Sequence, residues 1–164
     1  MPIVAEVGRG GRREIAAYNA GMSADEKHGR VLALDVGLRR IGLAVSDALG
    51  ITAQGLPTLQ RRNKRSDLAA LRQVAEKHEV AEVVVGHPLH MSGKAGKQAE
   101  KVVAFADDLR EHLGLPVHLW DERLTSAQAN RLLRETDMSI RRRGEVVDQM
   151  AAVLILQAWL DARS

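Results

Sequence analysis

The segment VLALDVGLRRIGLAVSD, residues 31–47, constrains the fold of this chain more than any other. Residues Val31 to Val36 are apolar on both faces except for one carboxylate, Asp35, which is typical of a strand buried in the centre of a sheet. A Gly-Leu-Arg-Arg turn and a second apolar run, Ile41 to Val45, predict a second strand. Burying an ionised carboxylate is costly unless it is paired, solvated or bound to a cation. Asp35 is therefore a candidate functional residue.

Beyond these two strands, the pattern changes from strands to alternating helices and strands. A third strand is expected at the edge of the sheet, because a Gly-Leu-Pro break interrupts its apolar run. The later elements are predicted as a strand at 51–59, a helix at 66–80 capped by Ser66, a strand at 82–88, a helix at 97–113, a strand at 116–122, a helix from Thr125-Ser126 to about Glu135, and a helix at 145–162. The order βββαβαβαα predicts an α/β fold, with a five-stranded mixed sheet flanked by helices.

Length and composition predict one domain. The chain has 164 residues, of which 45% are hydrophobic, enough for one sizeable core. Residues 1–28 are rich in Gly and Arg and lack a sustained apolar period, so we expect a flexible extension before a single domain at 29–164. The absence of cysteine fits a reducing compartment, and no apolar run approaches the roughly 18 residues of a membrane span. We expect a cytoplasmic protein.

The basic residues indicate a polyanionic partner. Net charge is only +3, but Arg provides 18 of the 24 basic residues, and its fork of donors suits phosphate oxygens. The basic clusters are Arg39-Arg40, residues 61–65, Lys94-Lys97-Lys101 and residues 141–143. A single cluster is more often a solvated face, but four of them favour nucleic acid. Since only 2% of residues are aromatic, phosphate contacts rather than base stacking should dominate affinity.

Acidic residues lie where several predicted elements begin or end. Asp35 ends the first strand, Asp121 and Glu122 end the fifth, and Asp148 lies in the first turns of the last helix. If the first and fifth strands end on the same side of the sheet, these acids converge. Carboxylate oxygens are ligands that Mg²⁺ prefers, and two such ions can hold and activate a phosphodiester. Asp35 is thus a candidate metal ligand.

Four segments, ALDVGLRRIGLAVSD, VVVGHPLHMSGKAG, DERLTS and VVDQMAAVLILQAWL, resemble in order and spacing the motif blocks of the YqgF/RuvX family. Its members are described as Holliday-junction resolvases or pre-16S rRNA nucleases with an RNase H-like fold. The resemblance covers residues 30–162. It implies that Asp35, Glu122 and Asp148 are both the catalytic and the metal-binding residues, with Mg²⁺ or Mn²⁺ as cofactor.

The resemblance also implies the reaction. The expected activity is two-metal hydrolysis of phosphodiester bonds, either at the 5′ end of pre-16S rRNA during ribosome biogenesis or in branched DNA junctions. Structured RNA or branched DNA is then the partner, together with ribosomal precursor particles.

Five basic residues are the candidate nucleic-acid contacts. Gly93 and Gly96 let a phosphate approach the backbone beside two lysines closely. The candidates are Arg39, Arg40, Lys94, Lys97 and Arg123. Both Arg40 and Arg123 could instead do no more than pair with neighbouring acids.

His87 and His90 stand where the family commonly has other residues, Leu or another apolar residue in the first case and Asn in the second. We expect His87 to be a loop histidine satisfied by backbone, and it is not among the candidate catalytic residues.

Other interpretations remain open at this point. Asp35 could receive N–H bonds of the turn, Glu122 could be a solvated acid paired with Arg123, and Asp148 could be a first-turn acid favoured by the helix dipole. The chain could then be a nucleic-acid-binding module without catalysis. An actin-like or sugar-kinase-like ATP binder also uses an Asp-x-Gly strand and turn around phosphate. That class needs two such subdomains, whereas this chain has one copy.

Overall fold

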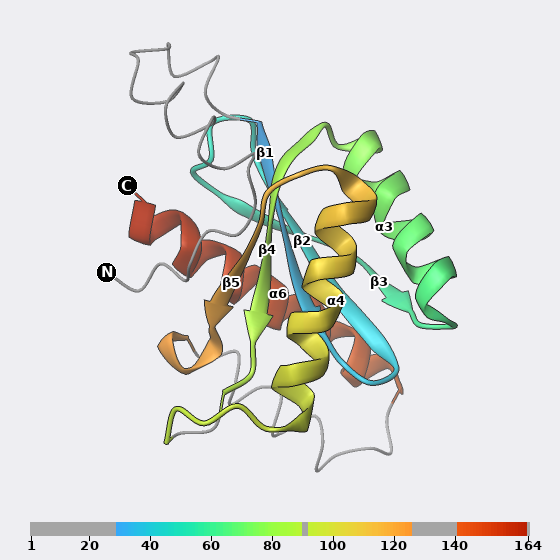
Figure 1. Ribbon diagram of the computed structural model, residues 1–164. Helices are drawn as coiled ribbons and strands as arrows, with labels where there is room; N and C mark the ends of the chain where they lie inside the picture. The colour runs from blue at the N-terminus through green and yellow to red at the C-terminus, as the bar shows by residue number, and fades with distance from the viewer. Residues whose placement is uncertain (1–28, 90–91, 126–140, 164) are drawn as a thin grey trace.

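The computed structural model describes residues 29–89, 92–125 and 141–163. They form five strands in one sheet and three α-helices (Figure 1). The elements are β1 (Arg30–Val36), β2 (Arg40–Ser46), β3 (Ala53–Gln60), α3 (Lys64–Lys77), β4 (Val80–His87), α4 (Lys97–Leu113), β5 (Val117–Asp121), the short 3-10 helix η1 (Glu122–Leu124) and α6 (Arg141–Arg163). The predicted α/β class and mixed sheet are confirmed. The extension at 1–28 and the body of the helix expected from Thr125 to Glu135 lie outside the described residues.

The sheet order β3-β2-β1-β4-β5 determines which strand ends meet. The first three strands form an antiparallel meander, whereas β4 runs parallel to β1 and β5 runs parallel to β4. As predicted, β3 is an edge strand. Because the three parallel strands end at the same edge of the sheet, the acids at the ends of β1 and β5 lie at that edge.

Two apolar layers cover the two faces of the sheet. Figure 1 shows α3 and α4 on one face and α6 on the other. Alternate residues of β1 belong to different layers, with Leu32 and Leu34 on the α3/α4 face and Val31 and Ala33 on the α6 face. Since side chains alternate along a strand, Asp35 lies on the α6 face.

The start of α3 differs from the sequence prediction. The cap is Asn63, not Ser66, and the helix begins at Lys64. Asn63 Oδ1 accepts a hydrogen bond from the Ser66 backbone N–H at 2.9 Å, so Ser66 lies within the first turn. An Asn cap satisfies one of the free N–H groups of that turn as well as a Ser cap would. The last helix, α6, begins at Arg141, four residues before the predicted start.

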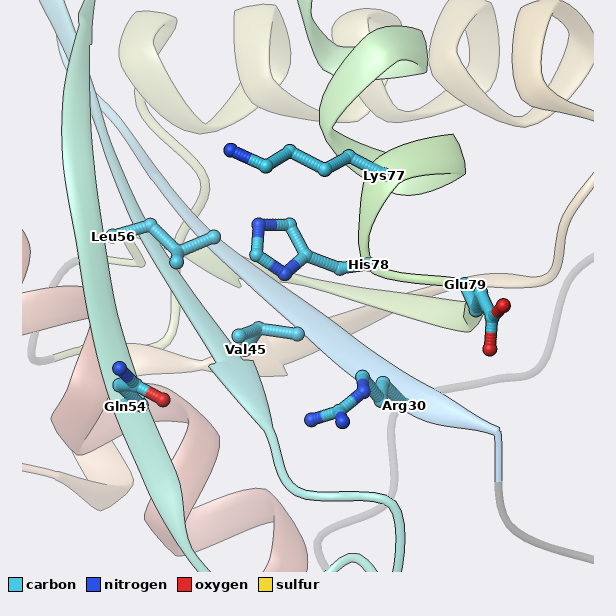
Figure 2. A pocket seen from close by; sticks show the side chains of 7 residues that line it. All are labelled: Arg30, Val45, Gln54, Leu56, Lys77, His78 and Glu79. Atoms are coloured by element: carbon cyan, nitrogen blue, oxygen red, sulfur yellow. The ribbon is translucent and has the colours of Figure 1, made fainter.

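A pocket of about 400 Å³ opens at the other end of β1 from Asp35 (Figure 2). Arg30 at the start of β1, Val45 on β2 and His78 at the end of α3 are among the residues that line it. This pocket is therefore separate from the edge that carries the acids. In the described part of the chain, no helix is long and apolar enough to cross a membrane.

Candidate active site

Two glycines flank Asp35 in the sheet. Asp35 is 1% exposed and lies opposite Gly42 of β2. On the other side, β1 pairs with β4 up to Leu34 and Val85, and Gly86 is one residue further along β4. Glycine inside a strand often marks a close approach of other atoms. Both neighbours of Asp35 therefore leave space on the α6 face.

The space at Gly42 is filled by the backbone of α6. A side chain at Gly42 would overlap the carbonyl group of Asp148. The helix thus crosses the sheet in contact with β2 and places Asp148, which is 3% exposed, beside the end of β1. This contact is the reason that an acid of α6 reaches the same face as Asp35.

The space at Gly86 is filled by Glu122. A Cβ atom at Gly86 would overlap Glu122 Oε1 and would also contact Ile155. Glu122 is fully buried and opens η1 directly after β5. Asp121 caps η1, since its carboxylate accepts the Arg123 backbone N–H at 3.0 Å. Because the strand changes to a 3-10 helix at this point, the side chain of Glu122 is directed into the protein interior.

Asp35, Glu122 and Asp148 thus form a group of buried carboxylates, here called the acid cluster. Asp148 lies over β2 and Glu122 over β4, the strands on either side of the one that carries Asp35. Neighbouring strands are about 4.8 Å apart, so the three acids share a small region of one face. The convergence of elements expected from the sequence is present in the structure.

Arg40 provides a positive charge beside this group. Its Nε donates to Asp148 Oδ2 at 2.7 Å, and the two side chains are 20% and 4% exposed. Among the described side chains, no three His, Asp or Glu residues are already arranged as a metal-ligand set. Ligation by Asp148 would compete with the Arg40 ion pair. The donors themselves are oxygen atoms only, which is the set that Mg²⁺ and Mn²⁺ accept.

Asp121 is not a member of the acid cluster. Its carboxylate pairs with Arg123 at 2.5 Å. The hydrogen bond from Arg123 is the largest influence and holds the pKa of Asp121 below its usual range. The same contact raises the pKa of Arg123. Of these two adjacent acids, Asp121 pairs with the exposed Arg123, whereas Glu122 is buried.

The candidate nucleic-acid contacts lie in different settings. Arg39, Lys94 and Lys97 are exposed, while Arg40 is largely buried in its ion pair. A Cβ atom at Gly93 would lie 3.4 Å from an Arg123 terminal nitrogen, so the loop before α4 passes beside that arginine. The basic cluster at 141–143 lies outside the described side chains.

His87 lies at the end of β4, beside Asp121 of β5. Its Nε2 is buried and has no hydrogen-bond partner in the part of the chain that the structure describes, so the expected backbone contact is not found at this atom. Burial lowers the pKa of His87, and the nearby Asp121 carboxylate opposes this only in part. The imidazole is therefore neutral near pH 7. His90 lies outside the described residues.

Two features of the site were not expected from the sequence: the glycines that admit the acids, and a partly buried ion pair that holds the β1–β2 turn. Arg61 Nε lies 3.2 Å from Asp67 Oδ2, and Asp67 is 2% exposed. A signal for Gly42 and Gly86 was available, because each interrupts an apolar strand. No comparable signal marked Asp67, which has the usual appearance of an acid in the first turn of a helix.

Replacing Gly86 by alanine should displace Glu122, because the added methyl group would overlap its carboxylate. We expect the nuclease activity that the family resemblance implies to fall at least about tenfold, since misplacement by 1 Å can cost two orders of magnitude. The measurement is turnover together with the thermal unfolding midpoint. Gly114→Ala is the control, because Gly114 has φ +67° but nothing within 4 Å of an added Cβ, at the far end of α4. Equal activity losses in both variants would contradict the proposed seat for Glu122.

Comparison with known proteins identifies relatives over most of the chain. A protein of Koribacter versatilis that carries the provisional name pre-16S rRNA nuclease is 63% identical over 136 residues, 83% of this chain and 89% of the relative. One of Moorella thermoacetica with the same name is 54% identical over 132 residues, 80% of this chain and 94% of the relative.

The fold has a counterpart among solved structures. T. thermophilus RuvC in complex with a Holliday junction substrate superposes with a TM-score of 0.53 at 16% identity, over 82% of this chain and 95% of that one. The expected RNase H-like fold is thereby confirmed. A family model described as RuvX, Holliday junction resolvase, matches residues 29–162. With these relatives and this match, the chain belongs to the RuvX family, a family of nucleases.

Proposed function

We propose that this protein is a divalent-metal-dependent nuclease whose substrate is precursor 16S rRNA. The observation that carries the proposal is the acid cluster, in which two glycines admit Glu122 and Asp148 on either side of Asp35. Carboxylate oxygens gathered on one face are the donors that a divalent cation accepts, and a bound cation would add positive charge to that of Arg40, which pairs with Asp148. The presence of all three acids favours catalysis over a binding module.

Asp35, Glu122 and Asp148 are the residues that would hold Mg²⁺ or Mn²⁺. When bound, the ions would supply an activated water and stabilise charge at the phosphate. Arg40 pairs with Asp148 through its Nε and balances part of the negative charge, and a bound ion would compete with this pair. The low exposure of all three acids keeps bulk water away from their oxygens.

The substrate is held by exposed basic side chains around this edge. Arg39 lies in the β1–β2 turn and Arg123 in η1. Lys94 lies in the loop before α4, and Lys97 is the first residue of α4. Such contacts would bind the phosphate backbone and would not read sequence. The enzyme would then recognise its substrate by the shape of the folded nucleic acid and not by its base sequence.

Replacing both Lys94 and Lys97 by alanine should weaken binding and flatten its salt dependence. Each phosphate contact contributes about −0.9 to the slope of log K against log salt on a duplex, so the slope should change by about 2. Fluorescence anisotropy at several salt concentrations measures it. Arg72→Ala/Lys77→Ala is the charge-matched control on α3, because both are exposed and remote from the acid cluster. An unchanged slope would remove Lys94 and Lys97 from the phosphate-binding surface.

The test of the function compares two substrates side by side, with and without Mg²⁺. One is precursor 16S rRNA, the molecule in the names of the relatives, as a fragment that spans the 5′ end implied by the family resemblance. The other is a four-way DNA junction, the second candidate, which the family description and the substrate of T. thermophilus RuvC favour. Magnesium-dependent cleavage of the RNA supports the proposal, and cleavage of the junction alone supports the second candidate. Binding of both without cleavage would favour the noncatalytic module.

Ribosomal precursor particles are the partners that rRNA processing implies, and a cytoplasmic location follows from the same proposal. Co-sedimentation of the protein with particles that contain uncut 16S rRNA would support this association.

A further inference from the structure

The turn between β1 and β2 combines a firmly held backbone with an exposed apolar side chain. Leu38 is 75% exposed, the highest value among the large hydrophobic side chains that the structure describes as exposed. It follows Asp35 by three residues, a span of at most about 11 Å. Exposed leucines occur singly on most protein surfaces, so exposure alone indicates no function. The way in which the turn is held provides the second observation.

Groups from outside the hairpin bind the backbone carbonyls of this turn. Gly37 O accepts a hydrogen bond from Arg61 Nη1 at 2.8 Å, and Arg39 O accepts one from the Arg61 backbone N–H at 2.8 Å. The carbonyl of Val36 accepts a hydrogen bond from Gln98 Nε2 of α4 at 3.2 Å. The inner side of the turn is therefore attached to two other parts of the molecule.

Arg61 is itself fixed by the core. Its Nε lies 3.2 Å from Asp67 Oδ2, and the Asp67 side chain is 3% exposed. Its guanidinium carbon also lies 5.3 Å from the centre of the Phe105 ring of α4. A loop that is already ordered loses little further entropy when it binds a ligand. The turn thus presents Leu38 at low entropic cost.

The surroundings of Leu38 favour nucleic acid over an apolar protein partner. Arg39 in the turn and Arg62, next to Arg61, are exposed, and the acid Asp67 is already paired with Arg61. Proteins that deform nucleic acids commonly insert a single apolar side chain such as leucine between two bases, with cations on the adjacent phosphates. A rigid turn with one exposed leucine beside an arginine has this chemistry.

We propose that Leu38 inserts beside a base of the substrate and unstacks one base step within about three nucleotides of the phosphate that is cut, since stacked bases rise about 3.4 Å each. Arg39 contacts the adjacent phosphate. This inference rests on the proposed function and adds a substrate feature to it. The enzyme selects nucleic acids in which a base step near the cleaved bond opens easily, such as a mismatch, a bulge or a branch point.

The experiment uses 2-aminopurine, a base analogue whose fluorescence rises when it is unstacked, at successive positions of the precursor RNA and of the four-way junction. The Asp35→Asn protein binds without cutting, so the signal is independent of catalysis. We expect increased fluorescence at one or two positions in this protein, loss of the increase in Asp35→Asn/Leu38→Ala, and its retention in Asp35→Asn/Leu38→Met.

Cleavage rates provide the second readout, with Leu38 changed in an otherwise unaltered protein. Leu38→Ala should slow cleavage of a fully paired site at least about tenfold, because the leucine no longer offsets the cost of unstacking the base step. A mismatch placed at that step should restore most of the rate, because the step is then already open. Leu49→Ala is the matched control, since Leu49 is 50% exposed in the turn at the other end of β2.

Each result separates the inference from the proposed function. The inference is overturned if the fluorescence does not depend on Leu38. It is also overturned if Leu38→Ala slows cleavage of the fully paired and the mismatched site equally. If the protein cuts neither substrate while the fluorescence still depends on Leu38, the proposed function is wrong, and only the insertion of Leu38 beside a base is upheld.

Discussion

Asp35→Asn, Glu122→Gln and Asp148→Asn should each lower turnover at least about 100-fold, a loss of roughly 3 kcal/mol of transition-state stabilisation. Each change removes one negative charge from the acid cluster and keeps the size of the side chain. The protein would then hold a divalent cation less tightly and stabilise the reacting phosphate less. Substrate binding should stay the same or tighten, because a charge that repels phosphate is lost. Single-turnover cleavage and anisotropy measure the two effects separately.

Asp121→Asn is the control for these three variants. It removes the same charge one residue from Glu122, but Asp121 is paired with Arg123 outside the acid cluster. We expect activity within about threefold of the unaltered protein, since asparagine can still accept the Arg123 backbone N–H and ion pairs that water reaches contribute little. A loss as large as that of Glu122→Gln would mean that the wrong acid of the pair has been assigned. Full activity in all four variants would place cleavage at another site.

Removing divalent metal should abolish cleavage while the fold persists. We expect at least about a 100-fold loss after treatment with EDTA, because the buried carboxylates alone provide no activated water at neutral pH. Mg²⁺ or Mn²⁺ should restore the rate. Ca²⁺, which accepts looser geometry, should support binding without efficient cleavage. The measurement is turnover against added metal, with circular dichroism as the check on folding.

A matched comparison makes this result specific to the acid cluster. In Asp148→Asn, the metal concentration for half-maximal activity should rise relative to the unaltered protein, whereas it should not change in Asp121→Asn. Undiminished activity after thorough metal removal would rule out metal-dependent hydrolysis.

The fold could be predicted largely because most elements have an unambiguous apolar period. The helix at 97–113 was predicted with the bounds that α4 has, since its stripe is regular and Gly114 ends it. The start of α3 was misplaced because Asn63 stands inside a basic run, where only the hydrogen bond to the Ser66 N–H identifies it as the cap. Propensity ranks the two residues almost equally as caps.

The sequence places the acids of the candidate site at the ends of elements, but it does not indicate how they meet, and their catalytic role stays a prediction. Strand order, which the sequence does not state, brings the end of β5 next to that of β4. The choice between Asp121 and Glu122 came from the family resemblance. In the structure, Glu122 is buried and Asp121 is not because β5 ends at Asp121 and a 3-10 helix begins at Glu122. No alternating apolar pattern predicts this change. The ion pair between Arg40 and Asp148 joins residues 108 positions apart, so local sequence patterns do not predict it either.

The helix α6 carries Asp148 and also supplies the helix side of one of the two core layers, from Ala151 to Leu160. One helix thus serves both the interior and the proposed chemistry, and neither role can be altered alone. A shift of α6 by one residue would rotate its side chains by about 100° and turn Asp148 away from Gly42. Activity should therefore be lost on heating when this helix separates from the sheet. Substitutions that stabilise its apolar face should keep the enzyme active for longer at raised temperature.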